Sequence, residues 1–381
     1  MASSTAIDIL RISQTYTRYT SHIILIIGII GNFLNIFVFT NFKAFRNNQC
    51  ALYFVTESIS NICQLIIYFA IYVLVTPNGI DPGNSTLFWC KFRAMMIALC
   101  TVISFSTICF SACDQYLSTN LHFNLRKLST IKLAQILIFT AIVISILHAI
   151  PFCIFLEIRA SLCAVFNPIM SQYLSFFYYP ILSGLLPIFI ASLFSILAYR
   201  NVRRIVRRQI PIVRRRLDRQ LTAMVLIRVI TFVILTSPYA IQRMYTYIAK
   251  IDPSNLFPYA INILVGGIIS SFFNLNYAIS FYIFMASSSR FRRQINLPFT
   301  DDTVGLYTSS MSLMANAMEF TAECYVVESL LQSTLECVFN SSCLSTVMEF
   351  FLDTYLTNIK RLDANRTQYP LQTIIFTFVN N

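Results

Sequence analysis

The stretch WCKFRAMMIALCTVISFSTICFSACDQY, residues 89–116, decides how this chain is built. It begins with Trp89-Cys90 and ends with Asp114-Gln115-Tyr116, and the residues between are mostly apolar. In a helix, the 24 steps from Cys90 to Asp114 rise about 36 Å, which covers a bilayer core and part of both interfaces. The stretch is therefore predicted to be a transmembrane helix with a cysteine at one mouth and an acid at the other.

The composition as a whole is that of a membrane protein. Of the 381 residues, 56% are hydrophobic and only 12% are charged, and the mean hydropathy is +0.66, which is far from the globular norm. Apolar runs of spanning length occur at residues 22–42, 52–75, 92–117, 131–155, 174–199, 221–248 and 257–285. We predict an all-α membrane protein with a seven-transmembrane helix bundle.

Lysines and arginines alternate between the loops. The loops after the first, third and fifth spans and the segment after the seventh are basic, and residues 200–219 alone hold nine arginines. The intervening loops hold few. The positive-inside rule therefore places the N-terminus outside and the segment after the seventh span in the cytoplasm. The net charge of +12 follows from this topology and from attraction to anionic lipid, so no nucleic-acid partner is expected.

Four segments are expected along the chain: an extracellular N-terminus (1–21), a seven-transmembrane domain (22–286), a short amphipathic cytoplasmic helix after span 7 (287–299) and a C-terminal tail (300–381). Asn84 begins a glycosylation sequon on the outer side. The tail also carries sequons, at Asn340 and Asn365, although topology places it inside. These are chance, or the tail is an extracellular piece joined by gene fusion or faulty gene prediction.

The residues that usually carry metal or enzyme chemistry are scattered. Cysteines lie mostly within the spans, where they act as small apolar residues, and Cys90, Cys153 and Cys163 lie near the outer face. The chain has no Cys-x-x-Cys pair, no HExxH and no Gly-x-Ser-x-Gly motif, so we expect no metal site, no cofactor and no enzyme activity. Residues 251–359 contain no lysine, which excludes a retinal Schiff base in span 7.

The third span resembles the third helix of rhodopsin-like (class A) G-protein-coupled receptors, which has a cysteine outside and Asp-Arg-Tyr inside. Other positions that match this family, over roughly residues 20–295, are Gly31-Asn32, the helix-distorting residues Pro187, Phe232 and Pro238, and the basic segment after span 7. The resemblance implies a multi-pass receptor of the plasma membrane that transmits an extracellular ligand to a heterotrimeric G protein. The family's span 7 Asn-Pro-x-x-Tyr motif has lost its proline here, whether it is aligned on Ser280 or on Asn276.

The resemblance also implies a disulfide between Cys90 and the second outer loop. Cys163 is favoured as the partner, and Cys153 is the alternative. A polar core is implied as well, formed by Asn32, Asn61, Ser104 and Asn276. Asn61, or alternatively Ser60, stands where the family has a sodium-binding aspartate. We expect sodium binding to be lost or weak, because a hard cation prefers anionic oxygen.

The cytoplasmic motif Asp114-Gln115-Tyr116 departs from the family in its middle residue. In the family an arginine there pairs with an acid on span 6, and Asp218 keeps that acid position. Gln115 is neutral, so we expect a weaker latch at this site.

Glu57 and Arg228 lie at two positions that are apolar in the family, in spans 2 and 6. Either charge alone would be costly in the membrane, so the hypothesis is a Glu57–Arg228 ion pair that closes the inactive state. The alternative has Arg228 snorkelling to the headgroups and Glu57 hydrogen-bonded to a nearby hydroxyl.

The ligand is constrained only loosely. Ile97 stands where receptors for biogenic amines have an aspartate, and a buried ammonium needs such a counter-ion, so a small amine is disfavoured. The family resemblance makes a peptide, for example a neuropeptide, the expected ligand. A transporter or channel is the alternative function. It predicts internal repeats and polar midplane residues, and the sequence offers only Asn32, Asn61 and Asn276.

Overall fold

The computed structural model describes residues 2–42, 45, 48–74, 86–159, 162–207, 212–249, 255–288 and 291–292. The chain divides into two compact units, Met1–Asn316 and Ala317–Asn381, and the described residues all belong to the first. The sequons at Asn84, Asn340 and Asn365 and the tail 300–381 lie outside the described residues.

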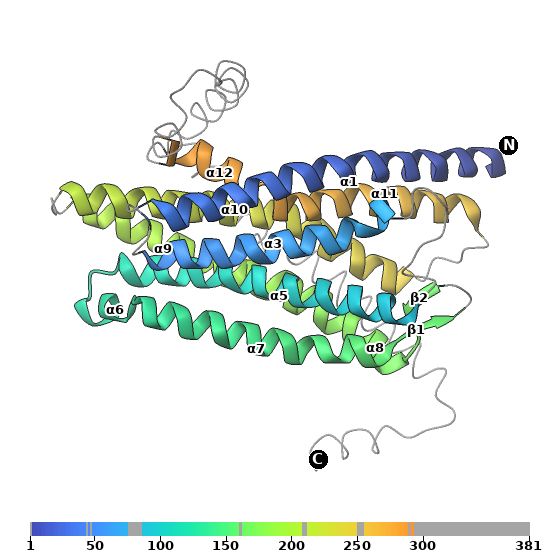
Figure 1. Ribbon diagram of the computed structural model, residues 1–381, viewed down its shortest axis with the longest axis horizontal. Coiled ribbons are helices and arrows are strands. Elements are labelled where there is room, and N and C mark those ends of the chain that lie inside the picture. The colour runs from blue at the N-terminus through green and yellow to red at the C-terminus, as the bar shows by residue number, and fades with distance from the viewer. Residues whose placement is uncertain are drawn as a thin grey trace, which may run out of the picture. The chain divides into compact units, whose positions relative to one another are not determined.

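Long helices carry the predicted spans (Figure 1). They are α1 (Ala2–Asn41), α3 (Gln49–Leu74), α5 (Leu87–Ser118), α7 (Ile131–Phe155), α9 (Leu186–Arg207), α10 (Ile212–Ala249) and α11 (Leu256–Ala278). The shorter elements are α6 (Phe123–Leu128), β1 (Leu156–Arg159), β2 (Leu162–Val165), α8 (Pro168–Tyr173), the π-helix η1 (Leu174–Leu185) and α12 (Ser280–Ser287). Seven helical segments are long and apolar enough to cross a membrane. The predicted seven-transmembrane bundle is confirmed.

Helix α5, which contains the stretch quoted first, is the centre of the packing. It contacts α3, α7, α9 and α10, while α1 packs against α3 and α11, and α10 against α9 and α11. Small residues allow the contact between α1 and α11 to be close. A Cβ on Gly28 would lie 2.9 Å from the Cβ of Ala278, so these two backbones approach as small residues allow in membrane bundles.

The first helix is longer than the expected span. It begins at Ala2 rather than near residue 22, and its 40 residues rise about 60 Å, roughly twice a bilayer core. Its outer half is not independent of the bundle, because a Cβ on Gly267 of α11 would lie 3.0 Å from Thr17 Oγ1 and 3.6 Å from Ser13 Oγ. Residues 2–21 therefore continue the first span as helix.

Two spans contain irregular turns. In the fifth, the π-helix η1 ends two residues before Pro187, and a Cβ on Gly184 would lie 2.9 Å from the carbonyl oxygen of Tyr179, so the wide turn requires glycine there. The seventh span is interrupted at Ile279, and the short helix α12 follows it. Of the helix predicted over 287–299, the described residues are Ser287, Ser288, Phe291 and Arg292, and Phe291 is buried against Phe39.

Candidate functional site

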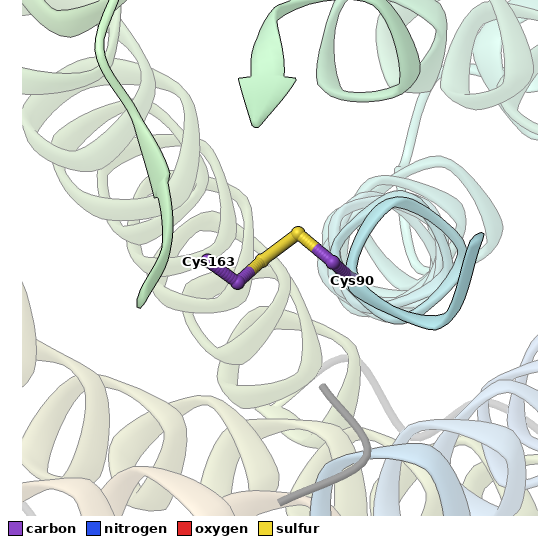
Figure 2. The surroundings of a disulfide bond; sticks show 2 residues. All are labelled: Cys90 and Cys163. Carbon is purple, nitrogen blue, oxygen red and sulfur yellow. A yellow bond between two sulfur atoms is a disulfide. The ribbon is translucent and has the colours of Figure 1, made fainter. Parts of the chain in front are cut away.

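At the outer end, a disulfide joins α5 to the loop after α7. Cys90 is bonded to Cys163, with 5.9 Å between their Cα atoms, and Figure 2 shows the bond crossing from helix to strand. Strands β1 and β2 form an antiparallel hairpin in which Cys163 pairs with Ile158. The alternative partner Cys153 is free, and its Sγ lies 3.1 Å from Met95 Sδ. The outer hairpin is thus covalently anchored to α5.

A neutral polar hub lies between α1, α3, α5 and α11. Asn32 Nδ2 donates to the backbone oxygens of Gly28 and Tyr277, each at 2.8 Å. Asn61 Nδ2 donates to Asn32 Oδ1 at 3.4 Å, and Ser104 Oγ donates to Asn61 Oδ1 at 2.8 Å. Each of these three side chains is fully buried, so their hydrogen bonds satisfy groups that hydrocarbon cannot.

Ser60 takes no part in this hub, because its Oγ donates to the backbone oxygen of Cys100 at 2.8 Å. Asn61, rather than Ser60, is therefore the residue of α3 that contacts Asn32 and Ser104. The hydrogen-bonding groups of the hub are amides, a hydroxyl and backbone carbonyls. Such a donor set lacks the anionic oxygen that a sodium ion prefers.

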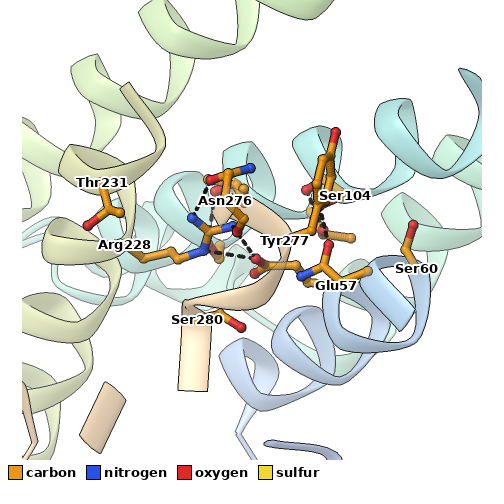
Figure 3. A network of polar contacts seen from close by, with 12 residues as sticks. Glu57, Ser60, Ser104, Arg228, Thr231, Asn276, Tyr277 and Ser280 are labelled. Carbon is orange, nitrogen blue, oxygen red and sulfur yellow. Dashed lines mark hydrogen bonds and ion pairs between the residues drawn. The ribbon is translucent and has the colours of Figure 1, made fainter. Parts of the chain in front are cut away.

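Asn276, which was expected in the same hub, instead contacts Arg228. Figure 3 shows the guanidinium of Arg228, on α10, between Glu57 of α3 and Asn276 of α11. Arg228 Nη2 lies 2.6 Å from Glu57 Oε1, and Nε donates to the same oxygen at 2.9 Å. Nη1 donates to Asn276 Oδ1 at 2.7 Å, and Nη2 also donates to the Asn276 backbone oxygen at 3.2 Å.

This ion pair is deeply buried. The side chains of Arg228 and Glu57 are 1% and 3% exposed, so neither charge reaches solvent or headgroups in this conformation. Burying two charges is tolerated only when geometry and further hydrogen bonds compensate the lost hydration, and Asn276 supplies those bonds. The network holds three helices, α3, α10 and α11, together inside the bundle.

At the cytoplasmic end of α5, Asp114 and Gln115 share Cys50 as a neighbour, and each has a second partner of its own. Asp114 Oδ1 accepts a hydrogen bond from Ser129 Oγ at 2.7 Å, and the thiol of Cys50 lies 3.6 Å from Oδ2. Gln115 Nε2 lies 2.8 Å from Cys50 Sγ, and Gln115 Oε1 accepts from Thr222 Oγ1 at 3.0 Å. Because Thr222 is on α10, Gln115 links α3 to α10 by uncharged hydrogen bonds.

Tyr116 and Asp218 are the other two residues predicted at the cytoplasmic end. Tyr116 packs its ring 5.5 Å from that of Phe194 on α9. Asp218 belongs to α10 by its backbone, but its side chain lies outside the described part of the structure. The role expected for Asp218 as the acid of a latch stays a prediction.

Of the predicted helix-distorting residues, Phe232 and Pro187 contact α5. Phe232 of α10 is fully buried, with its ring 4.8 Å from that of Phe105 on α5. Pro238 lies inside α10, where it removes a backbone donor. The backbone oxygen of Pro187 lies 3.5 Å from Cys109 Sγ.

Sequence reasoning missed several residues of these sites. Cys50 and Ser129 carry no motif that would have identified them as neighbours of Asp114. Arg243 could have been found, because an arginine five residues beyond Pro238 lies within a span and intramembrane charges mark functional sites. It lies among aromatic rings at the outer end of α10.

A sequence comparison with curated proteins gives no match. The family model for the seven-transmembrane receptors of the rhodopsin family matches residues 31–274. This range covers most of the helical bundle, from the end of α1 that holds Asn32 to Asn274 in α11. The chain therefore belongs to the rhodopsin family of seven-transmembrane receptors, a family of receptors rather than enzymes.

Proposed function

We propose that this receptor resides in the plasma membrane, binds an extracellular peptide between the outer ends of its helices, and activates a heterotrimeric G protein at its cytoplasmic end. The anchored hairpin beside α5 supports an outer binding site. The exposed arginines Arg203 and Arg204 near the end of α9 support a basic cytoplasmic face for a partner protein.

The observation that carries the proposal is the Glu57–Arg228–Asn276 network. It ties α10 to α3 and α11, and α10 cannot move outward without separating buried opposite charges. A ligand that stabilises the separated state would shift the population by its differential affinity for the two states. The pair is therefore proposed to close the inactive conformation.

The Gln115 contacts add a second, weaker tie between the same helices. A hydrogen bond between neutral groups is roughly half as strong as a charge-assisted one. The bond from Thr222 to Gln115 therefore contributes less than the salt bridge, and the buried pair is proposed to be the main restraint on α10.

The test is ligand-independent nucleotide exchange on a panel of G proteins, measured in membranes with matched receptor amounts. Glu57→Gln and Arg228→Leu should each raise basal exchange. The double swap Glu57→Arg with Arg228→Glu should bring it part of the way back, because opposite charges face each other again.

Exchange that is unchanged in both single variants, at equal surface expression, would contradict the proposed latch. Absence of exchange with every G protein, even with a peptide library added, would contradict G-protein coupling. Parallel proton- and sodium-flux measurements address the transporter or channel alternative, and a flux that depends on the receptor would favour it.

A further inference from the structure

Arg243 is a partly buried cation near the outer end of α10. Its guanidinium carbon lies 5.0 Å from the ring centroid of Tyr239 and 5.7 Å from that of Tyr179, which belongs to η1. Since Tyr179 and Tyr239 belong to different spans, the side chain lies between two helices of the bundle.

An aromatic wall continues from this cation toward α11. The ring of Tyr239 stacks on Phe273, with centroids 3.9 Å apart. Tyr179 packs against Tyr178 at 4.9 Å. Aromatic faces attract a cation through their quadrupole but carry no net charge, so they hold the guanidinium in place without neutralising it.

No acid neutralises Arg243 within the described ranges. The arginine–carboxylate pairs there are Arg228 with Glu57 and Arg159 with Glu157. The buried Arg228 has a carboxylate partner, whereas the neighbours of Arg243 are phenol rings. A cation removed from water without a counter-ion is costly, and a ligand that brings an anion would remove this cost.

A second arginine at the outer end has an unsatisfied polar group. Arg93 lies on α5, three residues beyond the disulfide cysteine Cys90, and its Nε is buried with no hydrogen-bond partner. Both arginines belong to the outer half of the bundle. Arginines without a carboxylate partner make the local potential positive, and a positive potential attracts anions.

Building on the receptor function proposed above, we propose that the ligand presents a carboxylate to Arg243 and an apolar or aromatic group to Tyr179, Tyr239 and Phe273. A planar guanidinium matches a carboxylate with two parallel hydrogen bonds, and the neighbouring rings favour flat apolar groups. The carboxylate belongs either to the free C-terminus of a peptide or to a small organic acid.

The test uses phenylacetate as the probe and phenylacetamide as its uncharged match. Thermal unfolding of the purified full-length receptor is followed in detergent at probe concentrations up to about 10 mM, where binding to the folded state raises the midpoint. Phenylacetate should bind at least about tenfold more tightly than phenylacetamide, because only the acid forms charge-assisted bonds.

Variants assign the effect to one side chain. Arg243→Gln should abolish the difference between acid and amide, and Arg243→Lys should keep part of it, because an ammonium is a point charge without the planar fork. Arg159→Gln is the matched control. Arg159 is an outer arginine that is exposed and already paired with Glu157, so the difference should persist unchanged.

Equal shifts with acid and amide, no shift with either, or a difference that survives Arg243→Gln would each overturn the carboxylate site. The wild-type comparison is decisive even if Arg243→Gln does not fold. Peptides with free C-termini, their C-terminal amides and a set of small acids, run in the same assay, identify the source of the carboxylate. The measurement needs no G protein, so acid-selective binding without nucleotide exchange would overturn the coupling and support the site.

Discussion

Removing one partner of the Glu57–Arg228 pair should destabilise the receptor more than removing both. The two side chains are 3% and 1% exposed, and the closest nitrogen–oxygen distance is 2.6 Å. Glu57→Leu would leave a buried guanidinium held only by Asn276, and Arg228→Met would leave a buried carboxylate. In each single variant an uncompensated charge stays in the bundle.

The magnitude follows from this burial. Breaking a buried pair by removing one partner costs about 3–5 kcal/mol. Replacing both partners with apolar residues of similar size is often neutral, or stabilising by about 1–4 kcal/mol. The double variant Glu57→Leu with Arg228→Met should therefore be at least as stable as either single variant, with a coupling energy of at least about 3 kcal/mol.

The measurement is a double-mutant cycle of unfolding stability on detergent-solubilised receptor. Arg204→Met is the matched control, because Arg204 is an exposed arginine on α9 whose replacement should change stability by no more than about 0.5 kcal/mol. The reasoning fails if the two single costs add in the double variant. It also fails if Arg228→Met costs as little as the control.

Variants at three further contacts test the structure. Gln115→Arg should lower basal nucleotide exchange by giving α5 a charged side chain beside α10. Thr222→Val removes the 3.0 Å bond to Gln115 and should raise basal exchange modestly, because a lost hydrogen bond costs about 1 kcal/mol. No change in either variant would count against this link. Gly28→Ala should lower the unfolding midpoint, because its Cβ would lie 2.9 Å from Ala278 Cβ. Gly266→Ala is the control: a Cβ there has nothing nearer than Gln242 Nε2 at 3.9 Å, so it should be neutral or stabilising by up to about 1 kcal/mol. Equal effects of the two substitutions would refute the packing argument. Cys163→Ser removes a disulfide that joins residues 73 apart in sequence. It should lower unfolding stability by about 2–4 kcal/mol and reduce surface expression. Unchanged expression would show that the bond is dispensable.

The positions of the spans could be predicted from the sequence because spanning is a local property. About 20 consecutive apolar residues suffice to cross a bilayer, whatever the rest of the chain does. Orientation is nearly as local, since it depends on lysines and arginines close to the span ends. The pairing of Glu57 with Arg228 could also be predicted, because a charge in an apolar span needs a partner and the spans offer few.

The partners of polar side chains were decided by tertiary structure. Asn276 faces Arg228 rather than the hub of Asn32 and Asn61, and Gln115 meets Thr222 and Cys50. The residue type shows that a side chain needs a hydrogen bond, but the rotation and spacing of neighbouring helices determine which group supplies it.

The same reason explains the length of the first helix and the overlooked cation. The helical outer half of α1 packs on α11 at Gly267. Arg243 is surrounded by rings from separate spans. Both features depend on contacts between segments far apart in the chain, whereas hydrophobicity and charge act on each segment alone.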